Sequence, residues 1–127
     1  PHYAGSISYI DEVELNLEPN EKIFIRLGNH SAITTAIWVN GKLAGHIPWK
    51  CADGLDITPF VINGKNLIEI EVVGSPRNML GPLHQKSGKR PWTDSRSFRT
   101  EGEEFTPNYV LMPFGLFDQV RLEIFSK

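Results

Sequence analysis

The stretch "AITTAIWVNGKLAGHI", residues 32–47, contains a strand pattern, a two-residue turn and a second strand pattern in direct succession. Its first half is rich in β-branched residues, which favour extended backbone in sheets. The dipeptide Asn40-Gly41 follows, and it tolerates the positive φ angles of a tight type I′ turn. The stretch therefore predicts an antiparallel hairpin in which residues 42–47 fold back on the strand before them.

Alternating apolar and polar residues predict more strands on both sides of this hairpin. Residues 6–18 carry mostly apolar side chains at odd positions, which is the period of a strand with one wet face. The same alternation occupies residues 23–27, 68–72 and 120–124. About seven or eight such strands bury one face each by stacking two sheets. We therefore expect an all-β, antiparallel β-sandwich of the jelly-roll type, with the first and last strands as neighbours.

One long stretch, residues 76–106, shows neither a strand period nor a helix period. The 127 residues of the chain suit a single domain, residues 1–127, with one hydrophobic core. A domain of this size seldom keeps so long an irregular loop without a use for it. The chain begins at Pro1, and we expect it to be a fragment or processed product of a larger protein.

Basic residues gather in this loop. Residues 76–99 hold six lysine and arginine residues against Asp94 alone, whereas the rest of the chain holds seven basic and fourteen acidic residues. The cluster fits either solvated charges or a surface that meets an anionic or hydroxyl-rich partner. The net charge of -2 provides no overall attraction to nucleic acid. No apolar run reaches the roughly 18–20 residues that span a bilayer. We expect neither nucleic-acid binding nor membrane insertion.

The region around the hairpin resembles a known domain family. The stretch "AIWVNGKLAGHIPWKCADGLDITPFVINGKNLIEIEVV", residues 36–73, is similar to the sugar-binding domain of family 2 glycoside hydrolases, the β-galactosidase and β-glucuronidase type. In that domain a "VWVNGK.AG" hairpin precedes "FDITPYLK.GKN.IEV.V". The opening "YAGSISYIDEVEL" resembles its first strand. The matching residues are Trp38, Val39, Asn40, Gly41, Gly45, His46, Asp56, Ile57, Thr58, Pro59, Gly64, Lys65 and Asn66.

The resemblance implies a galactose-binding-like sandwich that serves as a non-catalytic accessory module of a large bacterial glycoside hydrolase. Such enzymes keep their catalytic carboxylates in a separate barrel domain. The implied partners are carbohydrate, the catalytic domain of the parent chain, or both, and the implied location is extracytoplasmic, either periplasmic or secreted. The module then binds sugar weakly or shapes the substrate cleft. The alternative is a purely structural interdomain module without sugar binding of its own.

Candidate carbohydrate-binding residues follow from the way proteins hold sugars, which pairs an exposed aromatic plane with polar groups at its edge. Two tryptophans lie in predicted loops, and three polar residues lie among the leucines of "RNMLGPLH". The candidates are Trp49, Arg77, Asn78, His84 and Trp92. The structural alternative makes the tryptophans loop anchors and makes the three polar residues a hydrogen-bonded cluster.

The apolar residues of "LMPFGLF" are too many for one short exposed link. Phe114, Leu116 and Phe117 therefore either close the bottom of the sandwich or form an interface with another domain.

No catalytic or metal-binding pattern stands out in the sequence. The carboxylates of "EGEE", residues 101–104, fit a solvated run, and no Gly-x-Ser-x-Gly elbow marks an activated serine. The four histidines lack the spacing of a zinc site. We expect no cofactor, with a structural calcium ion at Asp53 and Asp56 as the alternative. We also expect no enzymatic activity from this chain alone.

Overall fold

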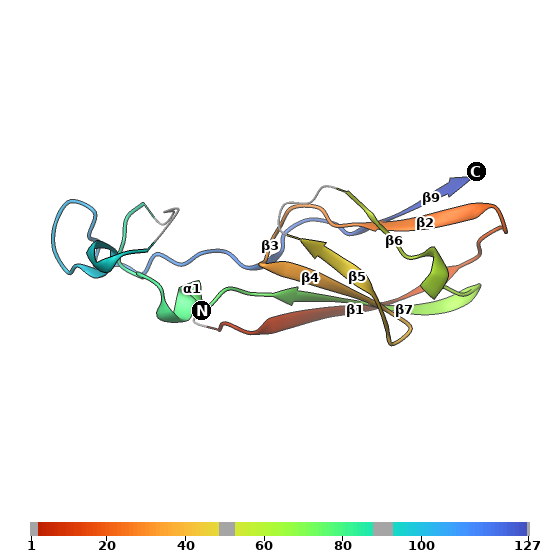
Figure 1. Cartoon of the computed structure of the whole chain (residues 1–127), viewed down its shortest axis with the longest axis horizontal. Helices are drawn as coiled ribbons and strands as arrows, with labels where there is room; N and C mark the ends of the chain where they lie inside the picture. Colours follow the sequence, from red (N-terminus) through yellow and green to blue (C-terminus); the bar gives the residue numbers. More distant parts are fainter. Residues whose placement is uncertain (1–2, 49–52, 88–92, 127) are drawn as a thin grey trace. The chain divides into compact units, whose positions relative to one another are not determined.

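The structure, a computed structural model of the 127-residue chain, describes residues 3–48, 53–87 and 93–126. The chain divides into two compact units (Figure 1). The strand unit comprises Ser6–Gly74 and Phe114–Lys127, and the loop unit comprises Pro1–Gly5 and Ser75–Pro113. The single-domain organisation of the chain stays a prediction.

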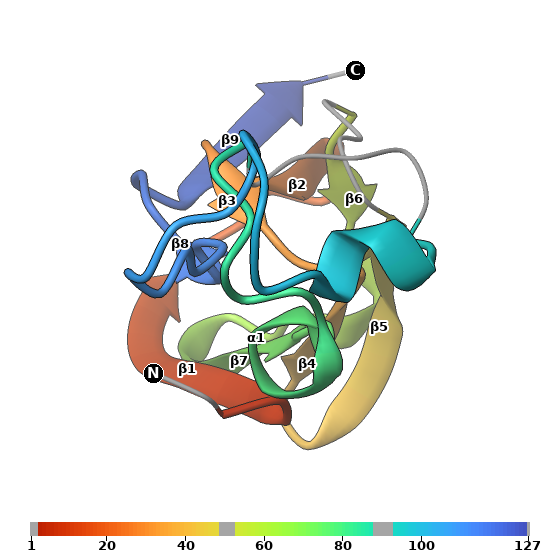
Figure 2. The same ribbon diagram turned by 90° about the vertical axis from the view of Figure 1, so that its left-hand side faces the viewer.

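The strand unit is an antiparallel β-sandwich of the jelly-roll type, as the sequence predicts. Its larger sheet has the order β1-β7-β4-β5 and its smaller sheet the order β6-β2-β9, and a short β3-β8 pair forms a third. The two larger sheets form two layers when the strands are viewed end on (Figure 2). The strands are β1 (Ser6–Leu15), β2 (Glu21–Arg26), β3 (His30–Ser31), β4 (Thr34–Val39), β5 (Lys42–Pro48), β6 (Leu55–Asp56), β7 (Gly64–Val73), β8 (Gly115–Leu116) and β9 (Arg121–Ser126).

The predicted hairpin joins β4 to β5. Val39 pairs with Lys42 across the turn, and the two turn residues have positive φ angles of 51° at Asn40 and 77° at Gly41. Both signs are those of a type I′ turn, whose twist matches that of the strands it connects. The prediction from Asn40-Gly41 is confirmed.

The first and last strands, which the sequence predicts to be neighbours, do not pair with each other: they are edge strands of different sheets, and side chains of both line one groove. All ten residues of β1 pair with β7, from Ser6 opposite Val73 to Leu15 opposite Gly64. β9 pairs with β2 instead. The physical reason is length, because only the ten-residue β7 offers β1 a partner along its whole extent.

The core lies between the two larger sheets. On β7 the even positions Ile68, Ile70 and Val72 are buried, and the odd positions between them face outward. From the smaller sheet, β2 contributes Ile23 and Ile25 to the core, and β4, which lies next to β7, contributes Ile37 and Val39. All four side chains have 0% exposure. This period-two burial is what the alternating sequence predicts.

Asn66 is a fully buried polar residue with all the hydrogen bonds that its side-chain amide needs. Its Oδ1 accepts from the Ile62 backbone N at 2.8 Å and from Asn40 Nδ2 at 2.9 Å. Its Nδ2 donates to the carbonyl oxygens of Ile62 at 2.7 Å and Gly64 at 3.0 Å. Part of the motif shared with the sugar-binding family therefore has a structural role, because it ties the β4-β5 turn to the start of β7.

The loop unit contains two short helical turns, α1 (Arg77–Leu80) and the 3-10 turn η2 (Ser95–Phe98). A second 3-10 turn, η1 (Thr58–Phe60), belongs to the strand unit. Neither these turns nor any other helix in the described ranges has the length and apolar character needed to cross a membrane.

Candidate functional site

Two extended passages of the loop unit run antiparallel and hold the halves of residues 76–106 together. Gln85 and Phe105 form a β-bridge. Next to it the Thr106 amide donates to the His84 carbonyl oxygen at 2.9 Å, and the Lys86 amide donates to the Glu104 carbonyl oxygen at 2.9 Å. Within the sequence stretch without a period, residues 84–86 are thus held by pairing with residues about twenty positions further along the chain.

The turn η2 is fixed by the side chain of Asp94. Its Oδ1 accepts from the backbone amides of Arg96 at 2.9 Å and Ser97 at 3.2 Å. The Asp94 amide in turn donates to the Ser97 hydroxyl oxygen at 3.4 Å, which completes a capping box. Burial alone raises the pKa of Asp94, but these hydrogen bonds and the positive charge of Arg96 outweigh it and lower the pKa. The cap therefore sets the positions of Arg96 and Arg99 at the two ends of the turn.

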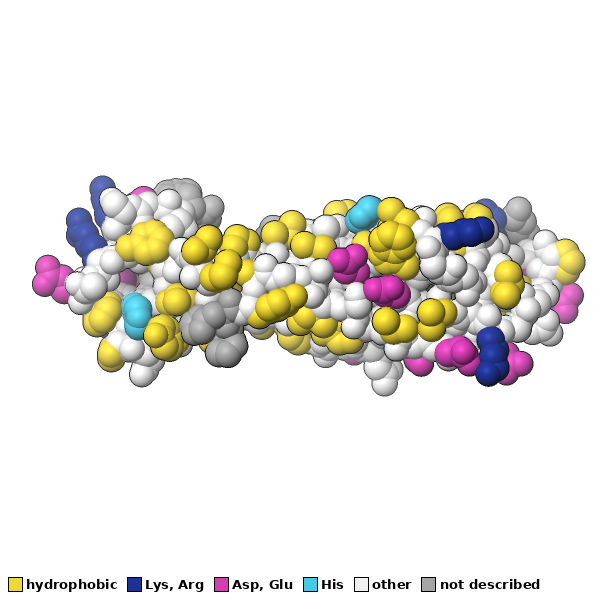
Figure 3. All heavy atoms as spheres, turned by 90° about the horizontal axis from the view of Figure 1, so that it is seen from below, with side chains coloured by type: hydrophobic (Ala, Val, Ile, Leu, Met, Phe, Trp, Pro, Cys, Tyr) yellow, Lys and Arg dark blue, Asp and Glu magenta, His cyan; other side chains and the backbone are white. Residues whose placement is uncertain are grey.

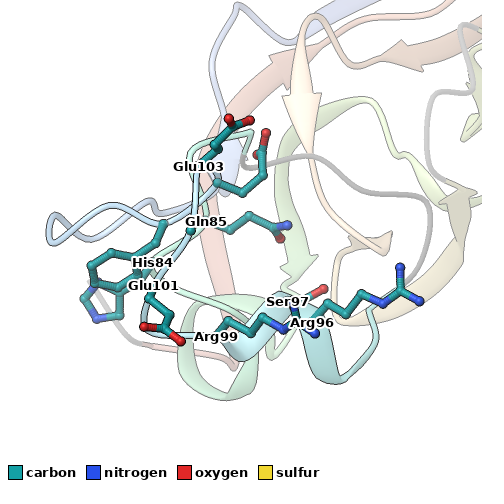
Figure 4. Close-up of a pocket in the computed structure, with 10 residues that line it drawn as sticks. His84, Gln85, Arg96, Ser97, Arg99, Glu101 and Glu103 are labelled. Atoms are coloured by element: carbon teal, nitrogen blue, oxygen red, sulfur yellow. The ribbon is translucent and has the colours of Figure 1, made fainter.

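The paired passages and η2 surround a pocket of about 360 Å³ within the loop unit. Figure 4 shows His84 and Glu101 on one side of this pocket, Arg96 extending on the other side, and Gln85 between them. Hydrogen-bond donors and acceptors thus line the same cavity. Such a mixture suits a ligand with several hydroxyl groups, and the volume is within the range of small-molecule sites.

His84 is a predicted site residue that lines this pocket. Its Nδ1 lies 3.0 Å from the Thr106 carbonyl oxygen, which fixes the orientation of the ring. The ring packs against Tyr109 and Phe105, with centroid distances of 5.0 and 5.9 Å. Tyr109 is 63% exposed, so the cluster presents an aromatic surface to solvent beside the pocket.

Arg77 and Asn78 lie in α1, outside the residues that line the pocket. Asn78 is 9% exposed, and its side chain exchanges two hydrogen bonds with the Met112 backbone, both 2.8 Å long. Arg77 lies against Gly81, and its Nη1 is buried without a hydrogen-bond partner in the described part of the chain. Burial lowers the pKa of this guanidinium group. A ligand role for either residue stays a prediction.

Trp49 and Trp92 lie outside the described residues, so their roles stay predictions. Of the three predicted interface residues, Phe114 and Leu116 pack against the core of the strand unit, whereas Phe117 is 50% exposed. Phe114 and Leu116 therefore fit the prediction that this stretch closes the sandwich, and Phe117 fits the prediction that it faces a partner.

The predicted calcium ligands Asp53 and Asp56 have different surroundings. Asp53 is exposed, whereas Asp56 accepts a hydrogen bond from the Thr58 amide at 2.9 Å and lies 3.9 Å from Lys22 Nζ. Within residues 3–48, 53–87 and 93–126, no three His, Cys, Asp or Glu side chains are grouped to hold a metal ion.

Several pocket residues were not selected from the sequence, among them Gln85, Arg96, Arg99 and Glu101. The basic cluster of residues 76–99 pointed to the region but did not separate these side chains from their neighbours. The Asp94-x-x-Ser97 spacing is the one local signal that would have placed the two arginines on a capped turn.

Parts of several solved glycoside hydrolase structures share the fold of this chain. A rhamnosidase from Novosphingobium sp. PP1Y matches 97% of this chain with a TM-score of 0.67 and 25% identity. A member of glycosyl hydrolase family 2 from Bacteroides cellulosilyticus matches 96% with a TM-score of 0.59 and 18% identity. An FMN-binding β-glucuronidase from Facaelibacterium prausnitzii L2-6 matches 94% with a TM-score of 0.55 and 20% identity.

The chain spans only 11–15% of the length of these three proteins. It therefore corresponds in size to one domain of a large glycoside hydrolase, which is consistent with a non-catalytic part. No protein-family model matches the chain, and no curated protein matches it.

Proposed function

We propose that this chain is a non-catalytic accessory module of a multidomain glycoside hydrolase and that its loop unit binds carbohydrate weakly. The observation that carries the proposal is the pocket lined by His84, two arginines and three glutamates, with the exposed ring of Tyr109 packed on the His84 ring. The similarity to a domain of large glycoside hydrolases supports the accessory role.

The chemistry of the pocket supports a sugar rather than an apolar ligand. The Tyr109 ring offers a face on which the C–H groups of a sugar ring can pack. Arg96 and Arg99 offer N–H donors for hydroxyl oxygens, and Glu101 offers acceptors for hydroxyl protons. These side chains are largely exposed, so water competes for the same hydrogen bonds, and we expect a Kd on the order of 1 mM.

The test is an NMR titration of the 15N-labelled chain with rhamnose, glucuronate, galactose and short oligosaccharides. We expect the amides of residues 84, 85 and 99–105 to shift, and Tyr109→Ala and Arg99→Ala to weaken the response. Tyr3→Ala is the matched control, because Tyr3 is also an exposed tyrosine of the loop unit and does not line the pocket, whereas the Tyr109 ring packs on the lining residue His84. A full panel without shifts in these residues would overturn the sugar-binding proposal.

The remaining predicted ligands are tested in the same titration. Tryptophan fluorescence should be quenched by a bound sugar, and Trp92→Ala should remove the change if Trp92 contacts it. Arg77→Ala and His84→Ala separate the contributions of α1 and the pocket. If the response to sugar is lost in His84→Ala but kept in Arg77→Ala, the ligand binds in the pocket and does not contact α1.

The second candidate function is an interdomain module without sugar binding, which shapes the catalytic cleft by packing. Large apolar side chains at the surface of the loop unit favour it, because Leu80 is 70% and Phe98 54% exposed. Leu80→Ser with Phe98→Ser should then lower association with the parent's catalytic part and leave sugar titrations unchanged. Unaltered association would count against this function.

A further inference from the structure

The strand unit carries an apolar groove of about 400 Å³ between its two edge strands β1 and β9. The core residues Ile25, Ile68 and Ile70 form part of its lining. Tyr9 and Val13 line it from β1, and Leu122 lines it from β9. The two sheets therefore leave a groove on this side that has buried core side chains beneath it.

Both strands beside the groove have an unused sheet edge. In the described part of the chain, β1 pairs with β7 alone and β9 with β2 alone. An edge strand presents a row of backbone N–H and C=O groups that can pair with another extended chain. Peptides bind other sheets in this way, with backbone hydrogen bonds for affinity and alternate side chains for specificity.

The charge around the groove selects for a basic occupant. Asp11 and Asp118 line it, and no described lysine or arginine does. The strand unit as a whole contains eleven acidic and seven basic residues. A carboxylate beside an apolar surface attracts a cationic side chain and repels an anionic one.

The apolar surface around the groove is larger than its lining alone. Beyond the lining residue Ile10 on β1, which is 61% exposed, Ile124 on β9 is 48% exposed. Figure 3 shows hydrophobic side chains intermixed with Asp and Glu side chains on one face of the strand unit. An occupant that covers such a surface needs apolar side chains together with positive charges.

We propose that this groove binds an extended peptide segment of a partner polypeptide, which adds to β1 as a further strand. The segment carries apolar residues at every second position and Lys or Arg opposite Asp11 and Asp118. The inference goes beyond the proposed function, because it concerns the strand unit and holds whether or not the loop unit binds sugar.

Two other occupants fit the groove less well. A sugar needs hydrogen bonds from its walls, but the isoleucine, valine and leucine side chains of the lining offer none. A second copy of β1 would bring Asp11, Glu12 and Glu14 against the same acidic residues of the first copy, which costs free energy.

The experiment uses the whole 15N-labelled chain and a capped nine-residue peptide in which valine alternates with lysine. A matched peptide has glutamate in place of lysine. We expect the lysine peptide to shift the amides of β1 and β9 and to slow hydrogen exchange along β1, and we expect the glutamate peptide to do neither. Raising the salt concentration should weaken the binding.

Variants of the rim test the role of the charges. Asp11→Asn combined with Asp118→Asn should weaken the lysine peptide about fivefold, because exposed ion pairs contribute roughly 0.2–1 kcal/mol each. Glu14→Gln is the control, because it removes a carboxylate from β1 that does not line the groove. Val120→Arg introduces bulk and positive charge into the groove and should abolish binding, with circular dichroism to verify the fold.

Three outcomes would overturn the inference. The first is the absence of shifts in β1 and β9 at peptide concentrations of about 1 mM. The second is an equal response to both peptides. The third is sedimentation that shows a dimer formed through β1, which would assign the groove to a second copy.

Discussion

Two hydrogen bonds join the side-chain amide of Asn78 to the backbone of Met112 within the loop unit. Asn78 Nδ2 donates to the Met112 carbonyl oxygen and the Met112 amide donates to Asn78 Oδ1, both at 2.8 Å, across 34 residues of chain. The amide side chain thus pairs with a backbone as a neighbouring strand would. A residue that the sequence suggested as a sugar ligand has a structural partner here.

Asn78→Ala should destabilise the loop unit by about 1–3 kcal/mol, because it leaves the Met112 N–H and C=O without these partners. Faster hydrogen exchange of the Met112 amide and a lower denaturation midpoint would measure the effect. Asn108→Ala, at an exposed asparagine of the same unit, should change stability by less than about 0.5 kcal/mol. Unchanged protection of Met112 in Asn78→Ala would contradict the role assigned to this bond.

Asn66→Ala should cost the strand unit about 3 kcal/mol or more, because it removes four hydrogen bonds from a fully buried site. Chemical denaturation followed by circular dichroism measures the loss. Asn20→Ala serves as the control, because Asn20 is exposed in the turn before β2. A similar stability for the two variants would show that the Asn66 network adds nothing to the fold.

Gly41→Ala should lower the unfolding free energy by about 1 kcal/mol, because an alanine at a φ of 77° is strained. A Cβ atom at this position meets nothing within 4 Å, so the backbone alone causes the loss. Gly41→Asn should cost less, since asparagine tolerates this region. Thermal denaturation compares the two variants, and equal losses would argue against backbone strain as the cause.

Asp94 should make the stability of the loop unit depend on pH in the acid range. Its pKa is lower in the folded chain than in the unfolded one, so its stabilising effect is complete above the usual value of about 3.9 and is lost as the pH falls through the lowered pKa. Carbon-detected NMR titration of the Asp94 carboxyl measures the shift.

The variant Asp94→Asn keeps an acceptor for the η2 amides but carries no charge. In the natural chain, the protection of the Ser97 amide from hydrogen exchange should therefore fall as the pH is lowered into the acid range. In Asp94→Asn this pH dependence should be absent. A carboxyl pKa at or above the usual value would show that the hydrogen bonds from Arg96 and Ser97 do not stabilise the charged form.

The strands with clear alternation were predictable, whereas the shortest elements were not. Residues 6–18, 68–72 and 120–124 correspond to β1, β7 and β9 with shifts of a few residues at their ends. The two-residue strands β3 and β8 and the one-turn α1 contain too few residues for any period to appear. The basic cluster directed attention to the loop unit, but only His84 among the predicted ligands lies in its described pocket.

The sequence by itself determined the all-β class, the Asn40-Gly41 turn and the buried face of β7, because local backbone preference and side-chain alternation act over a few residues. The tertiary structure decided that β1 pairs with β7 rather than β9, and it brought Gln85, Arg99 and Glu101 around one pocket. Both outcomes depend on contacts between residues that are far apart in the sequence. The free energies of such contacts depend on how the whole chain folds, so no short stretch of sequence predicts them.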